Sequence, residues 1–232
     1  MIFKNIIKPS LIITGVVFAA SLALSHVYKI TEPSITKQKA EKEREALFVV
    51  LPDFAIGEEK TDVMNGDTFR FWVGEKKNED DTVSTAYAFI TENPGYSGAI
   101  RSMVGIDAAG HIIGIYIIEQ TETPGLGARA VEGSASNTVW SALGKIISGQ
   151  EIEPDGYPWF QRQFAGLNAA QKIYIEKMGD WTPEKEQALL SKNAITNITA
   201  ATITGDAVIK SIERGYARLS SILEKEKETE AR

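Results

Sequence analysis

The segment MVGIDAAGHIIGIYII, residues 103–118, decides the class of fold. Two runs rich in apolar and β-branched residues, Met103–Asp107 and Ile112–Ile118, flank the short sequence Ala108-Ala109-Gly110-His111. Such runs favour β-strands, and a connection of three to five residues that contains glycine is typical of an antiparallel hairpin. We therefore expect a largely antiparallel sheet to be built around this hairpin.

Further elements follow on both sides of the hairpin. Upstream, Thr68–Val73 and Thr85–Ile90 read as strands separated by the polar loop Glu75–Thr82. Downstream, the pattern predicts helical or amphipathic segments at Asn137–Ile147, Trp159–Leu167 and Pro183–Leu190, and a long last helix that starts near Gly205. In that last helix, apolar residues recur at three- and four-residue steps. The sequence thus predicts an α+β domain, a largely antiparallel sheet with flanking helices.

An uncharged stretch of 20 residues, Pro9–Tyr28, precedes this domain. At about 1.5 Å per residue, a helix of this length spans roughly 30 Å, the thickness of a bilayer core. We expect a retained transmembrane helix. The alternative is a cleaved signal peptide, with Lys4 and Lys8 as its basic end and Ala23-Leu24-Ser25 as an imperfect cleavage site. The stretch is longer than a typical signal-peptide core, which favours the anchor, whereas basic residues on both sides leave its orientation open.

Charged segments border the domain at both ends. Ser34–Leu51 is rich in Lys, Glu and Ala and ends at Pro52, so we expect a charged helix leading away from the membrane. Glu224–Arg232 is highly charged and is expected to fray. The expected organisation is a short N-terminal tail at 1–8, a transmembrane helix at 9–30, a charged helical stalk at 31–52, a folded domain at 53–223 and a charged tail at 224–232.

Composition excludes several classes of function. The chain has 25 basic and 31 acidic residues, and its first 30 residues hold three lysines and no acid, so the remainder is markedly acidic. An acidic body is a poor match for a phosphate backbone, which argues against nucleic-acid binding. The absence of cysteine excludes thiol nucleophiles and thiolate-held iron–sulfur clusters, and two histidines disfavour a histidine-rich metal site. Redox chemistry would therefore need a cofactor held by other groups.

Three short segments stand out chemically. Asn93–Gly98 places two glycines around an aromatic residue, which lets the backbone approach a planar ligand closely. Glu122–Gly127 follows a predicted strand, combines proline with two glycines, and presents Leu126 with little backbone around it. Taken alone, Asn93–Gly98 is better explained as an ordinary turn, and Glu122–Gly127 is equally compatible with one.

The third segment, Thr199–Thr204, directly precedes the last helix. Small residues surround Thr202, which leaves its hydroxyl accessible, and Thr204 is positioned to cap the helix. A phosphate joined to Thr202 would lie at a helix N-terminus, where free N–H groups and the helix dipole favour an anion. A threonine-rich helix cap with no ligand is the simpler interpretation of this segment by itself.

Together, in this order and behind an apolar N-terminal stretch, the three segments resemble the FMN-binding domain family. That family includes the G subunit of the Rnf electron-transport complex and the C subunit of the sodium-translocating NADH:quinone reductase, and the modest length of this chain is more similar to the Rnf subunit. The resemblance implies FMN attached through its phosphate to Thr202, the threonine of a pattern of Ser or Thr, Gly, Ala, Thr. Here Ala200 stands where the family usually has Gly, and Thr196 where Asp is common. Alanine fits readily at that position only if its φ is negative.

The resemblance also implies roles within the site. Leu126 would bound one face of the flavin ring, Thr123 and the amides of Gly125–Gly127 would hydrogen-bond its polar atoms, and no residue is needed as a general acid or nucleophile. Tyr96, Ser97, Thr199 and Thr204 are candidates for the phosphate or the ribityl chain. The full set of expected cofactor-binding residues is Tyr96, Ser97, Glu122, Thr123, Gly125, Leu126, Gly127, Thr199, Ala200, Ala201, Thr202, Ile203 and Thr204, with no metal ligand.

By the same resemblance, the chain is expected to be an electron-carrying subunit of an Rnf-type complex that couples ferredoxin and NAD redox chemistry to ion translocation. Its partners would be other subunits, including flavin- and iron–sulfur-carrying ones, and a flavin transferase for maturation. It would be a single-pass protein of the cytoplasmic membrane with its flavin domain on the extracytoplasmic side. The alternatives are the quinone-reductase C subunit and a tethered sensory or scaffolding module without flavin.

Overall fold

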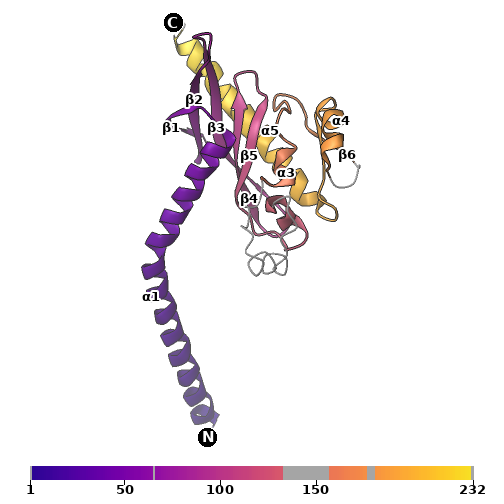
Figure 1. Ribbon diagram of the computed structural model, residues 1–232. Helices are drawn as coiled ribbons and strands as arrows, with labels where there is room; N and C mark the ends of the chain where they lie inside the picture. Colours follow the sequence, from indigo (N-terminus) through magenta and orange to yellow (C-terminus); the bar gives the residue numbers. More distant parts are fainter. Residues whose placement is uncertain (1, 65, 133–156, 177–180, 231–232) are drawn as a thin grey trace, which may run out of the picture. The chain divides into compact units, whose positions relative to one another are not determined.

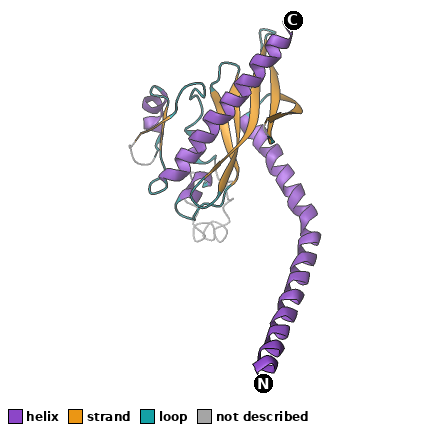
Figure 2. Cartoon of the chain, turned by 180° about the vertical axis from the view of Figure 1, so that it is seen from behind, coloured by secondary structure: helices purple, strands orange, loops and turns teal. Residues whose placement is uncertain are grey.

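A computed structural model describes residues 2–64, 66–132, 157–176 and 181–230; Figures 1 and 2 show it from opposite sides. The chain divides into two compact units, Met1–Arg44 and Glu45–Arg232. The helix predicted at Asn137–Ile147 lies outside the described residues.

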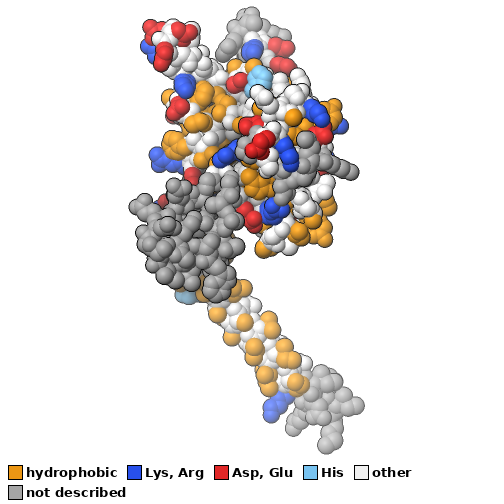
Figure 3. Space-filling view, turned by 45° about the vertical axis from the view of Figure 1, so that its right-hand side comes forward, with side chains coloured by type: hydrophobic (Ala, Val, Ile, Leu, Met, Phe, Trp, Pro, Cys, Tyr) orange, Lys and Arg blue, Asp and Glu red, His pale blue; other side chains and the backbone are white. Residues whose placement is uncertain are grey.

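Helix α1 spans Ile2–Val50, so the predicted span and the predicted stalk form one continuous helix. It contains the one stretch among the described helices that is long and apolar enough to cross a membrane. From Ile7 to Ile35 its large apolar side chains are exposed, and Figure 3 shows apolar side chains along the helix. Pro9 and Pro33 both lie inside α1, where each removes one backbone hydrogen bond while the flanking turns continue. By length and composition, the apolar part of α1 that precedes the charged stalk is suited to a lipid environment.

Five antiparallel strands form one sheet in the order β1-β2-β3-β4-β5 (Figure 1). The predicted hairpin is confirmed as β4 and β5, with Gly110 at φ +87° in its turn. Asp107 stabilises this turn, because its Oδ1 accepts hydrogen bonds from the N–H groups of Ala109 (2.9 Å) and His111 (2.8 Å). The strands are β1 (Ala55–Met64), β2 (Asp67–Lys77), β3 (Val83–Pro94), β4 (Ala99–Asp107) and β5 (Ile112–Glu119).

Two expectations about the upstream strands need correction. The predicted loop Glu75–Thr82 is shorter, because β2 continues to Lys77, where Lys77 Nζ pairs with Asp81 at 2.6 Å. Strand β1 was not predicted at all, since it is an edge strand whose side chains are mostly exposed and several of which are charged. Charged side chains are common at sheet edges, and they remove the hydrophobic alternation by which strands are recognised.

The pairing register builds two separate apolar faces. Phe71 lies opposite Phe89, and Phe89 lies opposite Val104, so that these side chains form a row on one face. On the other face, the end of α1 packs directly on the sheet: a Cβ on Gly105 would lie 2.2 Å from the carbonyl oxygen of Val50. A side chain at position 105 would therefore displace the helix end.

Helix α5 (Thr202–Glu230) lies along the first of these faces, as Figure 2 shows. It begins three residues earlier than predicted and continues to Glu230, into the segment expected to fray. Its buried residues, including Val208, Ile212 and Leu219, join the same apolar cluster as Phe89. This burial of an amphipathic face is what holds a helix of this length to the sheet.

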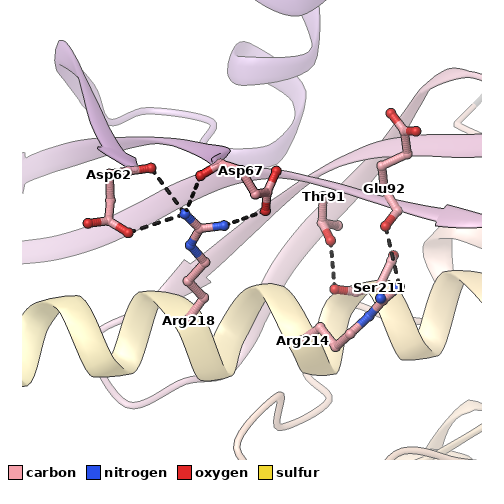
Figure 4. Close-up of polar contacts among 7 residues, drawn as sticks. All are labelled: Asp62, Asp67, Thr91, Glu92, Ser211, Arg214 and Arg218. Atoms are coloured by element: carbon pink, nitrogen blue, oxygen red, sulfur yellow. Dashed lines mark hydrogen bonds and ion pairs between the residues drawn. The ribbon is translucent and has the colours of Figure 1, made fainter. Parts of the chain in front are cut away.

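Polar contacts fix the register of α5 on the sheet (Figure 4). Thr91 donates its hydroxyl to the carbonyl of Ser211 at 2.7 Å, and Arg214 donates to the carbonyl of Glu92. Arg218 forms ion pairs with Asp62 and Asp67, and it also donates to their carbonyl oxygens at 3.1 and 2.9 Å. These contacts prevent α5 from sliding and so fix the position of its N-terminus.

Short elements complete the domain beside β5. The predicted amphipathic element at Trp159–Leu167 is helical only in its first part, and the segment at Pro183–Leu190 is helical as predicted, in two pieces. Strands β6 and β7 form a small parallel pair that was not predicted. These elements are η1 (Gly127–Val131), α3 (Trp159–Arg162), β6 (Tyr174–Glu176), η2 (Pro183–Lys185), α4 (Glu186–Leu190) and β7 (Ala194–Thr196).

Candidate functional site

The three segments singled out in the sequence meet at one cavity of about 410 Å³. One segment lies between β3 and β4, the second follows β5, and the third leads into α5. Pockets of about 300–1,000 Å³ are typical of small-molecule sites. The residues that line this one are Tyr96, Glu122, Thr123, Leu126, Gly127, Ala200, Ala201, Thr202, Ile203 and Thr204.

The first segment is the tight connection between β3 and β4. The N–H of Gly95 donates to the carbonyl of Gly98 at 2.7 Å, which closes the turn. Tyr96 stands at the tip with 74% of its surface exposed and borders the cavity. A Cβ on Gly98 would lie 2.1 Å from the hydroxyl oxygen of Thr121, so the turn packs closely against the segment that follows β5.

The second segment reverses the chain after β5. The carbonyl of Thr123 accepts hydrogen bonds from the amides of Leu126 (3.1 Å) and Ala128 (3.2 Å), and Gly125 has φ +75°, a conformation that favours glycine. Leu126 is thereby left 42% exposed at the cavity edge, whereas Glu122 is buried. The segment presents an apolar side chain outward and a carboxylate inward.

The third segment forms the N-terminus of α5. Helix α5 begins at Thr202, which is exposed, and its first turn contains no acidic residue. The first N–H groups of an α-helix have no partner within the helix, so this end offers donors and a positive partial charge toward an anion. Asp206 lies beyond the first turn and pairs with Lys210 at 2.6 Å, which offsets its charge.

The expectation that Thr204 caps this helix is wrong. Thr204 lies within the first turn and is buried, and its hydroxyl donates to Glu122 instead. The side chain of Asn197 supports the helix start: its Nδ2 donates to the carbonyl of Thr202 at 3.2 Å, and its Oδ1 accepts from the amide of Ile198. A Cβ on Gly205 would lie 2.1 Å from that Oδ1. Asn197 was missed from the sequence, because it lies five residues before the helix and donates to a carbonyl, a contact that has no capping signal.

Three residues of the predicted set do not line the cavity. Ser97 lies behind it, where its hydroxyl is 3.3 Å from that of Thr123 and its amide donates to Glu122. Gly125 shapes the second segment through its backbone, and Thr199 is exposed at the start of the third. The remaining ten residues of the set are the ten that line the cavity.

Ala200 has φ +63°, in the left-handed region where an alanine is strained by about 1–2 kcal/mol. Ala200→Gly should therefore raise the free energy of unfolding by about 0.5–1 kcal/mol, since relief of strain exceeds the extra entropy of the unfolded chain. Thermal unfolding of the full chain in detergent measures this. Ala201→Gly is the matched control: its φ is not positive and its methyl group is buried in the core, so glycine there should lower stability. Destabilisation by both substitutions alike would contradict strain at Ala200.

A larger cavity of about 650 Å³ lies among β2, β3, β4 and α5, but none of the three segments contributes to it. Three of its four guanidinium groups serve the fold: Arg70 is paired with Glu59 at 2.6 Å, and Arg214 and Arg218 hold α5 to the sheet. The smaller cavity has the features of a ligand site, since apolar side chains and a helix N-terminus converge on it. Within the described ranges, no group of three or more acidic or histidine residues is arranged to hold a metal ion.

Comparisons with known proteins agree with this location. Residues 95–217, which include the second and third segments and residues 95–98 of the first, match the FMN-binding domain family. The chain is 31% identical over 161 residues to the G subunit of the ion-translocating oxidoreductase complex of Haemophilus influenzae, covering 65% of this chain and 76% of that protein. It is 28% identical over 189 residues to the corresponding G subunit from Shewanella amazonensis, covering 75% and 85%.

A solved structure, that of the C subunit of the Na⁺-translocating NADH-quinone reductase from Parabacteroides distasonis, is similar with a TM-score of 0.49 and 17% sequence identity, covering 80% of this chain and 94% of that one. The family match extends over more than half of the chain and contains the whole candidate site. This chain therefore belongs to the FMN-binding domain family.

Proposed function

We propose that this chain is the membrane-anchored, FMN-carrying electron-transfer subunit of an Rnf-type ion-translocating oxidoreductase complex, with the FMN phosphate esterified to Thr202. The observation that carries the proposal is the convergence of three distant segments on one cavity, with the first residue of α5 at its edge. Membership of the FMN-binding domain family and similarity to the G subunits of ion-translocating complexes support it.

The third segment fits a phosphate. Thr202 is exposed, so its hydroxyl is accessible to an attaching enzyme. A phosphate ester on that oxygen lies at a helix N-terminus, where unpaired N–H groups stabilise an anion. The nearest acidic residue on the helix, Asp206, is already paired with Lys210. The phosphodiester that would join FMN to Thr202 carries one negative charge, and this end of the cavity favours that charge.

The rest of the cavity fits a flat ring. Tyr96, Leu126 and Ile203 come one from each segment, and all three are exposed beside the cavity. Exposed apolar side chains that border a pocket provide surface for an apolar or aromatic ligand. The amide of Leu126 is already bonded to Thr123, so we assign the amides of Gly125 and Gly127 and the hydroxyl of Thr123 to the polar atoms of the ring.

Bound FMN supplies the redox chemistry, and the chain supplies position, polarity and shielding from water. Attachment at Thr202 fixes the phosphate end, while the apolar side chains leave one edge of the site open to solvent. The chain contains no cysteine, so no thiol takes part. The proposed role, carrying electrons on a bound flavin, calls for no general acid or nucleophile from the side chains of this subunit.

Helix α1 would hold this domain at the cytoplasmic membrane as a single-pass anchor. We place the flavin domain on the extracytoplasmic side, where a flavin transferase attaches the cofactor. Its partners would be other subunits of the complex that carry flavins and iron–sulfur clusters, with ferredoxin and NAD as the redox couple.

Covalent flavin is tested with the full chain coexpressed with a flavin transferase in membranes. We expect a fluorescent band at the mass of the chain after denaturing electrophoresis, and a peptide containing Thr202 that carries FMN less one water. A non-fluorescent band and an unmodified peptide from active native material would contradict the proposal.

The electron donor of the purified native complex separates the Rnf assignment from a quinone reductase. We expect reduced ferredoxin, in the presence of NAD⁺, to support turnover. Turnover only with NADH and a quinone would identify the chain instead as a quinone-reductase C subunit.

A further inference from the structure

Glu122 differs from the other residues of the cavity because its side chain contacts both of the other segments. It is 6% exposed, and its carboxylate lies between the turn at Tyr96 and the start of α5. Oε1 accepts a hydrogen bond from the amide of Ser97 at 2.9 Å, and Oε2 accepts one from the hydroxyl of Thr204. One side chain of the second segment thus connects the first segment to the third.

Two glycines are packed directly against this carboxylate. A Cβ on Gly95 would lie 2.6 Å from Oε1, and a Cβ on Gly127 would lie 2.5 Å from Oε2. Both distances are shorter than contacts that real Cβ atoms make, so any side chain at either position would displace Glu122. The surrounding backbone therefore leaves room for the carboxylate only because these two residues are glycines.

Charge argues against direct contact between Glu122 and the flavin phosphate. Two negative groups in a partly buried site repel each other, whereas the helix N-terminus at Thr202 attracts an anion. A buried carboxylate is also costly unless its oxygens are hydrogen-bonded, and here both oxygens accept bonds from the protein. The role that remains for Glu122 is to hold the other two segments in place through these hydrogen bonds.

We propose that Glu122 is a positioning residue that joins the Tyr96–Ser97 turn to the first turn of α5, so that the cavity is formed before the cofactor arrives. The expected effect on flavin loading rests on the proposed function. The connection of the two segments by Glu122 is independent of it. Because both bonds use one carboxylate, weakening the bond to Thr204 also weakens the bond to Ser97.

The test is hydrogen exchange of the Ser97 amide, measured by mass spectrometry on the full chain in detergent. Glu122→Leu removes both acceptors and should speed exchange at least about tenfold. Glu122→Gln should stay within about threefold of the original chain, because its oxygen still accepts from Ser97 and its NH₂ can donate to the Thr204 hydroxyl. Glu58→Leu, at an exposed carboxylate on β1, is the matched control and should change nothing.

Substitution of Thr204 provides a second, independent test if Glu122→Leu does not fold. Thr204→Val keeps the shape but removes the hydroxyl, and it should speed exchange at Ser97 by about threefold or more although it lies on another segment. Thr204→Ser keeps the hydroxyl and should restore slow exchange. Unchanged exchange at Ser97 in Thr204→Val would overturn the link between the segments, as would unchanged exchange in a folded Glu122→Leu.

Flavin loading is read separately, as the fluorescent fraction of each variant after coexpression with a flavin transferase. We expect loading to fall severalfold in Glu122→Leu and Thr204→Val and to be retained in Glu122→Gln and Thr204→Ser. If the original chain carried no flavin, the proposed function would fail while exchange at Ser97 still decided the positioning role. Full loading in Glu122→Leu with fast exchange at Ser97 would overturn the claim that the cavity must be formed in advance.

Discussion

Thr202→Ala should abolish covalently bound flavin completely, because alanine has no oxygen from which a phosphate ester can form. The substitution removes an exposed hydroxyl at the first residue of α5 and leaves a residue with high helix propensity, so the fold should be retained. The measurement is in-gel fluorescence of the denatured full chain after coexpression with a flavin transferase, together with a melting temperature to confirm folding.

Two controls sharpen this result. Thr202→Ser keeps a hydroxyl at the same place and should retain at least part of the fluorescence, whereas Thr61→Ala, at an exposed threonine of β1, should retain all of it. Fluorescence that persists in Thr202→Ala would show that another residue carries the flavin. In that case Thr199 and Thr204 would be the next positions to examine, although Thr204 is 1% exposed.

Gln161→Leu should lower the free energy of unfolding by about 2–4 kcal/mol, because it leaves two buried backbone groups without partners. Gln161 is 2% exposed, its Oε1 accepts from the amide of Ile117 at 3.2 Å, and its Nε2 donates to the carbonyl of Ala130 at 2.9 Å. These bonds tie α3 to β5 and to η1, which lie on either side of the Glu122–Gly127 segment. The expected fall in melting temperature is about 5–15 °C.

Gln187→Leu is the matched control for this change. Gln187 is exposed on α4, so the same substitution there should alter stability by no more than about 0.5 kcal/mol. We also expect Gln161→Leu to reduce flavin loading, since the second segment loses one of its supports. Equal melting temperatures for the two variants would mean that the bonds made by Gln161 are replaced by others and do not hold the segment.

The strands and the last helix show which parts of the fold are encoded locally. The hairpin of β4 and β5 was predictable because its alternating runs and its glycine-containing turn lie within 16 residues. Strand β1 was not, because its charged residues mask the pattern and its pairing with β2 is what makes it a strand. The start of α5 was misplaced for a related reason: Thr204 has the sequence of a cap, but its hydroxyl is used by Glu122, 82 residues earlier in the chain.

In the candidate site, too, some features could be predicted from the sequence and others could not. Thr202, Leu126 and the glycines could be singled out from the sequence, because an accessible hydroxyl, an apolar surface and a tight turn each need particular residue types. That Glu122 faces Ser97 and Thr204, and that Gln161 supports the second segment, could not be read from it. Hydrogen bonds between distant segments leave no periodic signal in a sequence.

The sequence by itself determined the apolar helix, the antiparallel hairpin and the three short segments, since each depends on residues within a few turns or strands of one another. Only the tertiary structure decided that the segments enclose one cavity, that α5 begins at Thr202, and that Ala200 takes a left-handed conformation. The physical reason is that these features depend on how the sheet register and the buried contacts of α5 bring distant backbone together, and that packing can override local preference.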